Sequence, residues 1–434
     1  MKKITIIIAL VALTFQGFGQ KVDKLIKQKD VERIIKTLSA DDMQGRATFT
    51  PGIEKAAQFI ESEYKKTGLL PMAGNTGYRQ NFSMIRTSLV KSSVNINGVK
   101  IPADSVAILS SASFSWTNLS DAEVVVLPPD GDLQRDYRKY AASGKKQIVI
   151  VDPKFSSFFK RLQIFTRGGR PAFKDSPAPA QVPVVFVIGK FDAIKSFSIS
   201  HEVKKEELPL FNIAGIIPGK TKPDEYVIFS GHYDHLGIIR PMEGDSIANG
   251  ADDDASGTTA VLTLAKYFKK LDNNARTLIF VAFTAEEIGE FGSQYFATTV
   301  TPDKVVAMFN IEMIGKASKW GQNAALITGF ERSSFGTILQ KNLEGTAFKF
   351  YPDPYIKENL FYRSDNASLA RVGVPAHTIS TDQIDIDKLY HTVKDEFSTL
   401  DVGNITSTIK AIALSSRTIV SGQDTPTRVA KLER

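Results

Sequence analysis

The chain has 434 residues, of which 42% are hydrophobic and 23% charged, as is typical of a globular protein of two or three domains. It contains no cysteine, which excludes disulfides, thiolate metal ligands and lipid attachment through cysteine. The formal net charge is +7, but Lys and Arg are scattered rather than striped along the sequence, which argues against nucleic-acid binding.

Residues 1–19 predict a secretory signal peptide. Lys2 and Lys3 precede the apolar run 4–15, and Gly17-Phe-Gly19 is typical of a cleavage site. The run is too short to span a hydrocarbon layer about 30 Å thick. We therefore expect a bacterial protein exported to the periplasm or the medium, with a core large enough to need no disulfides.

Two helices are predicted in residues 20–84. Asp30 is a suitable cap for the first, whose apolar stripe covers residues 31–38. The second begins after Thr50-Pro51 and ends at Gly68. Each helix has one apolar face, so we expect both to pack on a larger core.

Residues 85–207 predict a separate β-rich domain. Short apolar strands are separated by polar stretches rich in Pro and Ser, and one helix is predicted at 133–142. The predicted strands are 94–97, 123–127, 147–151 and 182–187. No catalytic combination of residues occurs in this segment.

From residue 208 onward, strands and helices alternate. The nearly wholly apolar run 277–283 is typical of a central strand covered on both faces. Such alternation predicts an α/β sandwich, in which sites lie at the carboxyl ends of strands. The predicted strands are 211–217, 226–230, 277–283, 305–311, 324–328 and 376–379, and the helices are 256–270, 291–298, 333–343, 365–372 and 402–420.

His and acidic residues follow or precede several of these core elements. Imidazole and carboxylate together suit zinc, and five such groups at one edge of a sheet favour a metal site. Two metals about 3.5–4 Å apart need one carboxylate that bridges them and another, free of metal, that moves protons. The candidates are His232, Asp234, His235, Asp252, Asp253, Asp254, Glu286, Glu287, Glu312 and His391.

Six segments together resemble the zinc-dependent aminopeptidases and glutamate carboxypeptidases of peptidase family M28. They occur in the family's order over residues 211–395, and Gln44-Gly-Arg46 is similar to the family's opening. The segments are His232-Tyr-Asp-His235, Gly250-Ala-Asp-Asp-Asp-Ala-Ser-Gly257, Ala285-Glu-Glu-Ile-Gly289, Asn310-Ile-Glu-Met-Ile-Gly315, Ser364-Asp365 with Gly373-Val-Pro375, and Tyr390-His-Thr392.

The resemblance implies a three-layer α/β/α zinc exopeptidase fold with a mixed central sheet, formed by residues 20–84 and 208–434. An inserted domain of the protease-associated type would cover 85–207. The resemblance also implies two zinc ions per chain. His232 and Glu312 would bind the first, Glu287 and His391 the second, and Asp253 would bridge both.

Further roles follow from the same resemblance. Glu286 would be the general acid/base, Tyr390 would hydrogen-bond the tetrahedral intermediate, and Asp234 would orient His232. Many relatives carry Asp at the position of Glu312, so we expect ligation with adjusted geometry there.

Four polar residues are left with lesser roles. Asp252 and Asp254 are expected to shape the turn around the bridging aspartate. We expect His235 behind the ligands or at the rim of the site. His377 has two open interpretations, as part of the substrate pocket or as a hydrogen-bonded core residue.

The predicted function is that of an exported di-zinc aminopeptidase acting on peptides. Zinc would polarise the peptide carbonyl, and Glu286 would pass a proton from the attacking water to the leaving amine. A carboxypeptidase, with Arg363 binding the substrate carboxylate, and a glutaminyl cyclase, which needs one zinc, are alternatives on the same scaffold. A non-catalytic binding protein should have lost ligands or base. We expect no nucleic-acid partner and no membrane association after signal removal, and the sequence leaves oligomeric state and specificity open.

Overall fold

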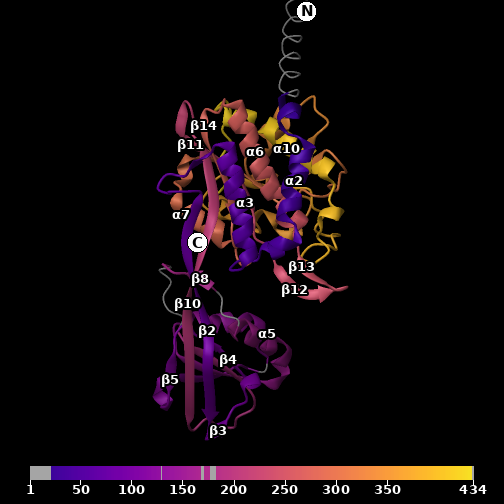
Figure 1. Cartoon of the computed structure of the whole chain (residues 1–434). Helices are drawn as coiled ribbons and strands as arrows, with labels where there is room; N and C mark the ends of the chain where they lie inside the picture. The colour runs from indigo at the N-terminus through magenta and orange to yellow at the C-terminus, as the bar shows by residue number, and fades with distance from the viewer. Residues whose placement is uncertain (1–20, 129, 168–170, 176–181, 433–434) are drawn as a thin grey trace, which may run out of the picture. The chain divides into compact units, whose positions relative to one another are not determined.

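The computed structural model describes residues 21–128, 130–167, 171–175 and 182–432. The chain divides into two compact units, which we call unit 1 (up to Phe82 and from Leu210 onward) and unit 2 (Ser83–Pro209) (Figure 1). The predicted signal peptide, residues 1–19, lies outside the described residues. Within those residues, no helix is both long enough and apolar enough to cross a membrane.

A mixed sheet forms the centre of unit 1, as predicted. Strand β11 runs parallel to β14 and β15, and β15 runs parallel to β18, whereas β10 is antiparallel to β14 and β16 is antiparallel to β18. In order across the sheet the strands are β17 (Lys349–Pro352), β16 (Ala324–Ile327), β18 (Ala376–Ser380), β15 (Val305–Ile311), β11 (Lys222–His232), β14 (Arg276–Phe283), β10 (Phe197–Ile217) and β2 (Arg79–Ile96). Only residues 210–217 of β10 and 79–82 of β2 belong to unit 1.

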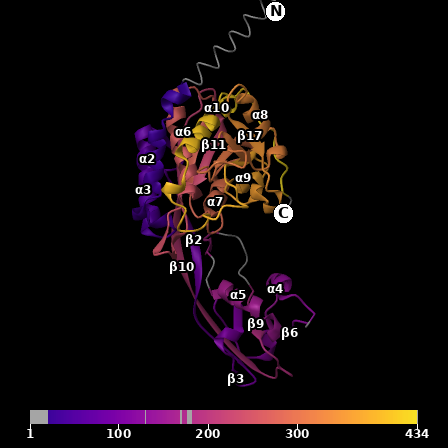
Figure 2. The ribbon, with the colours of Figure 1, turned by 90° about the vertical axis from the view of Figure 1, so that its right-hand side faces the viewer.

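Helices cover both faces of this sheet and complete the three layers (Figure 2). The larger core joins one face of the sheet to α2 (Gln28–Leu38), α3 (Pro51–Thr67), α6 (Gly257–Leu271), α8 (Phe335–Asn342) and α10 (Val402–Ser415). The smaller core joins the other face to α7 (Phe291–Thr299) and α9 (Asn366–Ala370). Strands β14 and β15 are buried over their whole length, which explains their apolar sequences.

The register of the parallel strands positions the site. His232, the last residue of β11, pairs with Phe283, the last residue of β14. Ser230 of β11 pairs with Asn310 of β15, two residues before Glu312. The segments that follow the three strands therefore leave the sheet at the same edge.

Local structure departs from the sequence-based elements in several places, including helix α5 (Ser156–Arg167), which was not predicted. Helix α2 begins at Gln28, so Asp30 lies in its first turn rather than at the cap. A carboxylate in the first turn still interacts favourably with the helix dipole. The predicted strands 94–97 and 211–217 are the ends of the longer β2 and β10. The predicted final helix is divided at Ser416 into α10 and α11 (Arg417–Val420).

Unit 2 contains a four-stranded sheet with helices packed on it. Its two hydrophobic clusters lie on the opposite faces of the sheet, and the helices α4 (Leu133–Ala142) and α5 (Ser156–Arg167) contribute to one of them. The sheet order is β4 (Val106–Leu109), β9 (Val184–Ile188), β7 (Gln147–Val151) and β6 (Glu123–Val126). Its assignment to the protease-associated type stays a prediction.

The remaining strands among the described residues are short. They are β1 (Leu70–Pro71), β3 (Val99–Lys100), β5 (Phe114–Trp116), β8 (Pro171–Phe173), and the hairpin of β12 (Gly237–Met242) and β13 (Asp245–Ala248).

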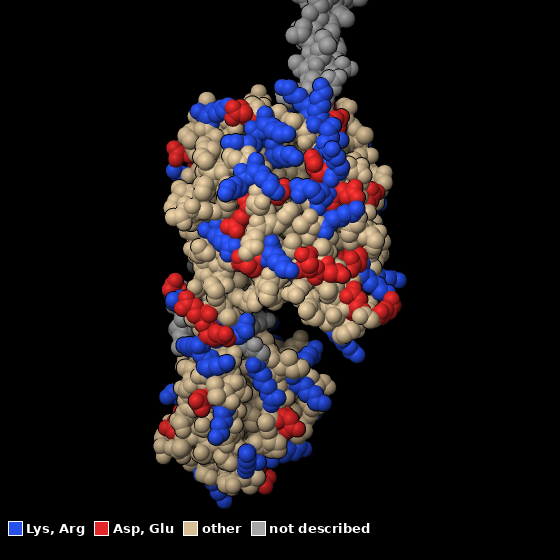
Figure 3. Space-filling view, in the orientation of Figure 1, with Lys and Arg blue, Asp and Glu red and all other residues tan. Residues whose placement is uncertain are grey.

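Charged side chains of both signs share the face of unit 1 seen in Figure 3. Lys266 pairs with Asp30 at 3.2 Å, and Arg33 pairs with Glu63 at 2.8 Å. The scattered charges of the sequence therefore remain interspersed on this folded surface.

Candidate metal centre

His232, Asp253 and Glu312 form the first group of side chains that can hold a metal. One potential ligand atom from each lies within 4.8 Å of the others, and His232 Nε2 is 3.1 Å from Asp253 Oδ1. His232 Nε2 and Glu312 Oε2 are buried without a hydrogen-bond partner among the described residues. Buried, unpaired donor atoms that converge in this way fit a metal ion.

Asp253, Glu287 and His391 form the second group. His391 Nε2 is 3.3 Å from Asp253 Oδ2 and 3.1 Å from Glu287 Oε2. Two ligand atoms on a tetrahedral zinc with bonds of 2.0–2.1 Å stand about 3.3 Å apart, which is close to these spacings. Asp253 thus presents one oxygen to each group, the arrangement that a bridging carboxylate needs.

The aspartates on either side of Asp253 hold the backbone around it. The Asp254 carboxylate accepts the N–H groups of His232 (3.2 Å), Gly257 (2.9 Å) and Met313 (3.2 Å). It thereby joins the ends of β11 and β15 to the start of α6. Asp252 accepts the N–H of Gly315 at 2.6 Å, so both residues shape the turn as expected.

Arg46 and Asp395 support the same turn, although the sequence did not single them out as site residues. The buried Arg46 guanidinium donates to the carbonyls of Asn249 and Gly250, and the Asp395 carboxylate accepts the N–H groups of Asp252 and Asp253. Both come from segments distant in sequence, so motif spacing could not reveal the contacts. For Arg46, the Gln44-Gly-Arg46 segment was the only signal.

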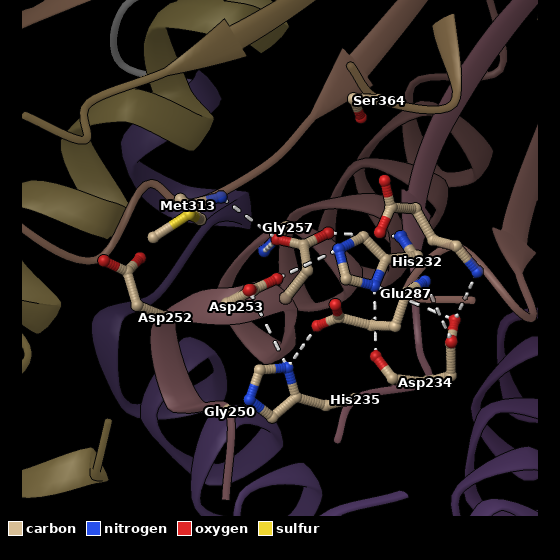
Figure 4. A network of polar contacts seen from close by, with 12 residues as sticks. His232, Asp234, His235, Gly250, Asp252, Asp253, Gly257, Glu287, Met313 and Ser364 are labelled. Carbon is tan, nitrogen blue, oxygen red and sulfur yellow. Dashed lines mark hydrogen bonds and ion pairs between the residues drawn. The ribbon is translucent and has the colours of Figure 1, made fainter. Parts of the chain in front are cut away.

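Asp234 acts on two neighbours through different groups. His232 Nδ1 is 3.0 Å from the backbone carbonyl of Asp234 but 3.8 Å from its carboxylate. The carboxylate instead accepts the N–H groups of Glu286 (3.1 Å) and Glu287 (3.4 Å). The backbone of Asp234, rather than its side chain, therefore makes the predicted contact that orients His232, and the side chain fixes the Glu286–Glu287 turn (Figure 4).

Glu286 belongs to none of the groups of described side chains that could hold a metal, which also include His235 with Asp253 and Glu287, and Asp252 with Asp382 and Asp387. Burial raises the pKa of its carboxyl well above the usual value. His232 opposes this shift, and the carboxylates of Glu312 and Asp365 add to it. A carboxyl group that is free of ligand contacts and has a raised pKa is suited to transferring protons.

The protonation of the ligands reflects their crowding. Burial disfavours ionised Asp253, but its close contact with His232 and the charge of His235 outweigh this and hold its pKa well below the usual range. Burial raises the pKa of Glu312 to about 7. Burial lowers the pKa of His391, but hydrogen bonds to Asp253 and Glu287 outweigh it and raise the value to about 10. Metal binding would therefore displace protons from the site.

His235 is fully buried behind the second group, which excludes the position at the rim. Its Nδ1 is 2.6 Å from Glu287 Oε1 and 3.7 Å from Asp253 Oδ2. Figure 4 shows the ring lying beside both carboxylates. The alternative expectation, a position behind the ligands, agrees with this arrangement.

A cavity of about 60 Å³ adjoins Glu312 and Tyr390. Apolar side chains form much of its lining, and Arg363 lies at its edge, paired with Glu358 at 3.2 Å. The apolar members are Met313, Leu326, Leu360 and Ile384. The cavity therefore offers space for a substrate side chain beside the first ligand group.

His377 is a core residue rather than part of this cavity. Its Nδ1 bonds with the Thr328 carbonyl at 2.8 Å and its Nε2 with Ser333 Oγ at 2.7 Å, while its ring stacks on Phe335. Burial lowers the pKa of His377 to about 4, so the ring stays neutral near pH 7. Of the two interpretations left open by the sequence, the structure supports the hydrogen-bonded core residue.

Comparison with known proteins identifies the family. The model of peptidase family M28 matches residues 212–415, a range that contains all the candidate ligands. Over 287 residues the chain is 30% identical to leucine aminopeptidase 1 of Ajellomyces capsulatus (strain H88), and the match covers 61% of this chain and 68% of that protein. The chain belongs to peptidase family M28. It is therefore a metallopeptidase, and the resemblance inferred from its motifs is confirmed.

Two further similar proteins agree with this assignment. Over 107 residues the chain is 36% identical to the "Probable zinc metalloprotease" of Pyrenophora teres f. teres (strain 0-1), covering 24% of this chain and 23% of that protein. The structure of BSAP, a zinc aminopeptidase from Bacillus subtilis, matches with a TM-score of 0.56 and 17% identity, covering 92% of this chain and 97% of that one. The first supports zinc as the family metal, and the second supports the M28 fold.

Proposed function

We propose that this M28 peptidase is an aminopeptidase that uses two zinc ions per chain to remove N-terminal residues from peptides. The position of Asp253 carries the proposal. Its Oδ1 lies 3.1 Å from His232 Nε2, and its Oδ2 lies 3.3 Å from His391 Nε2. A carboxylate whose two oxygens each lie next to a different histidine is suited to bridging two metals.

The donor atoms divide into two sets. His232, Asp253 and Glu312 would hold one zinc, and Asp253, Glu287 and His391 would hold the other. Bound zinc would polarise the peptide carbonyl and lower the pKa of a water molecule. All the protein ligands are imidazole or carboxylate groups, as this chemistry requires.

Glu286 is proposed to carry the proton during hydrolysis. It would accept a proton from the attacking water and deliver it to the leaving amine. Its raised pKa suits the first step, because a carboxyl group whose pKa lies above the usual range accepts a proton more readily. The N–H groups of Glu286 and Glu287 donate to the Asp234 carboxylate, which keeps the two side chains on a fixed turn.

Tyr390 is proposed to stabilise the reacting carbonyl. It lines the cavity beside Glu312 and stacks on His391 with ring centroids 3.8 Å apart. Burial and the nearby carboxylates raise the pKa of its phenol, so the group stays protonated. It is therefore available to donate a hydrogen bond to the oxygen on which charge develops.

The charges around the cavity favour recognition of a substrate amino terminus. Glu312 and Asp382 contribute carboxyl groups to the cavity lining, where a terminal ammonium would bind. Arg363 is the only cation among the described residues that line the cavity, and Glu358 pairs with it. This balance supports an aminopeptidase over a carboxypeptidase. A glutaminyl cyclase would have no need for the second set of ligands.

We also propose that the protein is exported, on the basis of the signal-peptide pattern in residues 1–19. The mature chain recovered from a bacterial host should begin near Gln20 by mass spectrometry. A mature chain that retains Met1 or Lys2 would exclude cleavage at this site.

Hydrolysis of matched substrates tests the proposed activity. Leucine p-nitroanilide, its N-acetylated form and an N-blocked peptide with a free carboxyl terminus would be compared with and without chelator. We expect cleavage of the free-amine substrate only, loss of activity with chelator and recovery with zinc. Cleavage confined to the blocked peptide would show a carboxypeptidase.

A further inference from the structure

His235 makes a close contact with a candidate ligand of the second metal. Its Nδ1 lies 2.6 Å from Glu287 Oε1, while Glu287 Oε2 lies 3.1 Å from His391 Nε2. The two oxygens of Glu287 thus face different partners, the first His235 and the second His391. The His235 side chain has no exposed surface, and that of Glu287 is 6% exposed, so water competes little for this contact.

The distances distinguish a hydrogen bond from shared metal coordination. Two ligand atoms on one tetrahedral zinc are about 3.3 Å apart, and the His391 contacts with Asp253 and Glu287 match that spacing. The contact between His235 and Glu287 is shorter than these by half an ångström or more and lies in the range of a charge-assisted hydrogen bond. Because a carboxylate only accepts, His235 Nδ1 must carry the proton.

The surrounding backbone keeps the ring in this orientation. Gly250 has a left-handed φ of +55°, and a Cβ built there would lie 2.5 Å from two atoms of the His235 ring. The backbone N–H of His235 donates to the carbonyl of Arg46 at 3.3 Å. The ring therefore packs directly on the glycine that begins the Asp253 turn (Figure 4).

We propose that His235 is a positioning residue for the second metal. Its Nδ1–H holds Glu287 Oε1, so that Glu287 offers the metal only Oε2, on the same side as His391. Outer partners of metal ligands set ligand orientation, and their loss commonly costs 10–100-fold in metal affinity. This inference rests on the two-metal site proposed above.

A pair of substitutions separates the donor from the volume of the ring. His235→Asn keeps an N–H donor near the position of Nδ1, whereas His235→Leu fills the site without a donor. Zinc affinity of both sites would be measured on metal-free protein by competition with a chromophoric chelator. We expect His235→Leu to weaken the second site about 10–100-fold. His235→Asn should stay within about threefold of wild type, because the hydrogen bond is kept.

Replacing zinc by cobalt adds a second measurement, the visible spectrum, which reports on the ligands of the metal rather than on the stability of the fold. The visible spectrum of Co²⁺ in the second site should be the same in wild type and His235→Asn if His235 is not a ligand. Wild-type second-site affinity in His235→Leu would overturn the inference. The inference would also be overturned if His235→Asn bound zinc at the second site as weakly as His235→Leu, or if its cobalt spectrum were altered. Either result would indicate that His235 is itself a ligand.

These measurements do not use hydrolysis, so they are independent of the activity. If the wild type binds two zinc ions but cleaves no peptide, the proposed aminopeptidase function fails, while the affinities still decide the role of His235. A wild type that binds a single zinc would overturn both the inference and the two-metal site. Thermal unfolding of the metal-free variants checks that the fold is kept.

Discussion

Arg46→Met is expected to destabilise unit 1 by about 4 kcal/mol or more. The Arg46 side chain is fully buried and donates to the carbonyls of Leu38, Tyr233, Asn249 and Gly250 over 2.6–2.9 Å. Methionine fills much of the same volume but offers no donor. Each buried acceptor left unpaired costs about 1–3 kcal/mol, so four losses at the lower end amount to about 4 kcal/mol.

Urea unfolding of the metal-free protein measures this change. Trp320 reports on unit 1, and a Trp116→Phe background removes the signal of unit 2. With a slope of about 3 kcal/mol per molar urea, the midpoint should fall by more than about 1 M.

Arg33→Met is the matched control. Arg33 is 47% exposed and pairs with Glu63 at the surface, so its loss should cost about 1 kcal/mol or less. If Arg46→Met unfolds at the same urea concentration as Arg33→Met, the guanidinium does not stabilise the turns around the metal centre, and the reasoning is refuted.

Three further substitutions test separate parts of the account. Glu286→Gln should keep its zinc by elemental analysis and lower kcat about 10²–10⁴-fold, since it removes the proton carrier; unchanged kcat would exclude that role. Tyr390→Phe should lower kcat about 10²-fold with little change in KM, and an effect on KM alone would point to substrate binding instead. Burial lowers the pKa of His377 from 6.5 to about 4, so on acidification the unfolded chain takes up a proton before the folded one. The stability of the folded state that comes from keeping His377 neutral is fully present above pH 6.5. It is lost as the pH falls toward 4, by at most about 3 kcal/mol. Urea titrations of His377→Gln should show a correspondingly shallower pH dependence, and an unchanged slope would contradict this assignment.

Much of the fold of unit 1 could be predicted because its signals are local. The apolar run at β14 and the strand–helix alternation reflect burial on both faces of a sheet. The outer part of β10 was missed, although Phe197, Ile199 and His201 are buried alternately with exposed residues. Its many charged residues hid this alternation. The end of helix α3 at Gly68 was predicted correctly, because glycine is the residue that most often adopts the left-handed conformation that ends a helix.

The candidate site could be predicted in residue type but not in geometry. Glycine-flanked His and Asp segments, and acids that follow strands, gave the candidate ligands from chemistry alone. The contact between His235 and Glu287 depends on the pairing of β11 with β14, and sequence spacing does not show that His235 lies behind the ligands. The role of Arg46 was hidden for a similar reason, because a buried cation is recognised only by the carbonyls around it.

The number of zinc ions bound when metal-free wild type and metal-free Asp253→Asn are titrated with zinc tests the central claim most directly. Titration of the wild type should bind two zinc ions per chain, with hydrolysis of leucine p-nitroanilide appearing as they bind. Asp253→Asn lacks the shared carboxylate that faces both His232 and His391, so both sites should weaken together and activity should be lost. A variant that binds two zinc ions with wild-type affinity, or a wild type that is fully active without metal, would contradict the account.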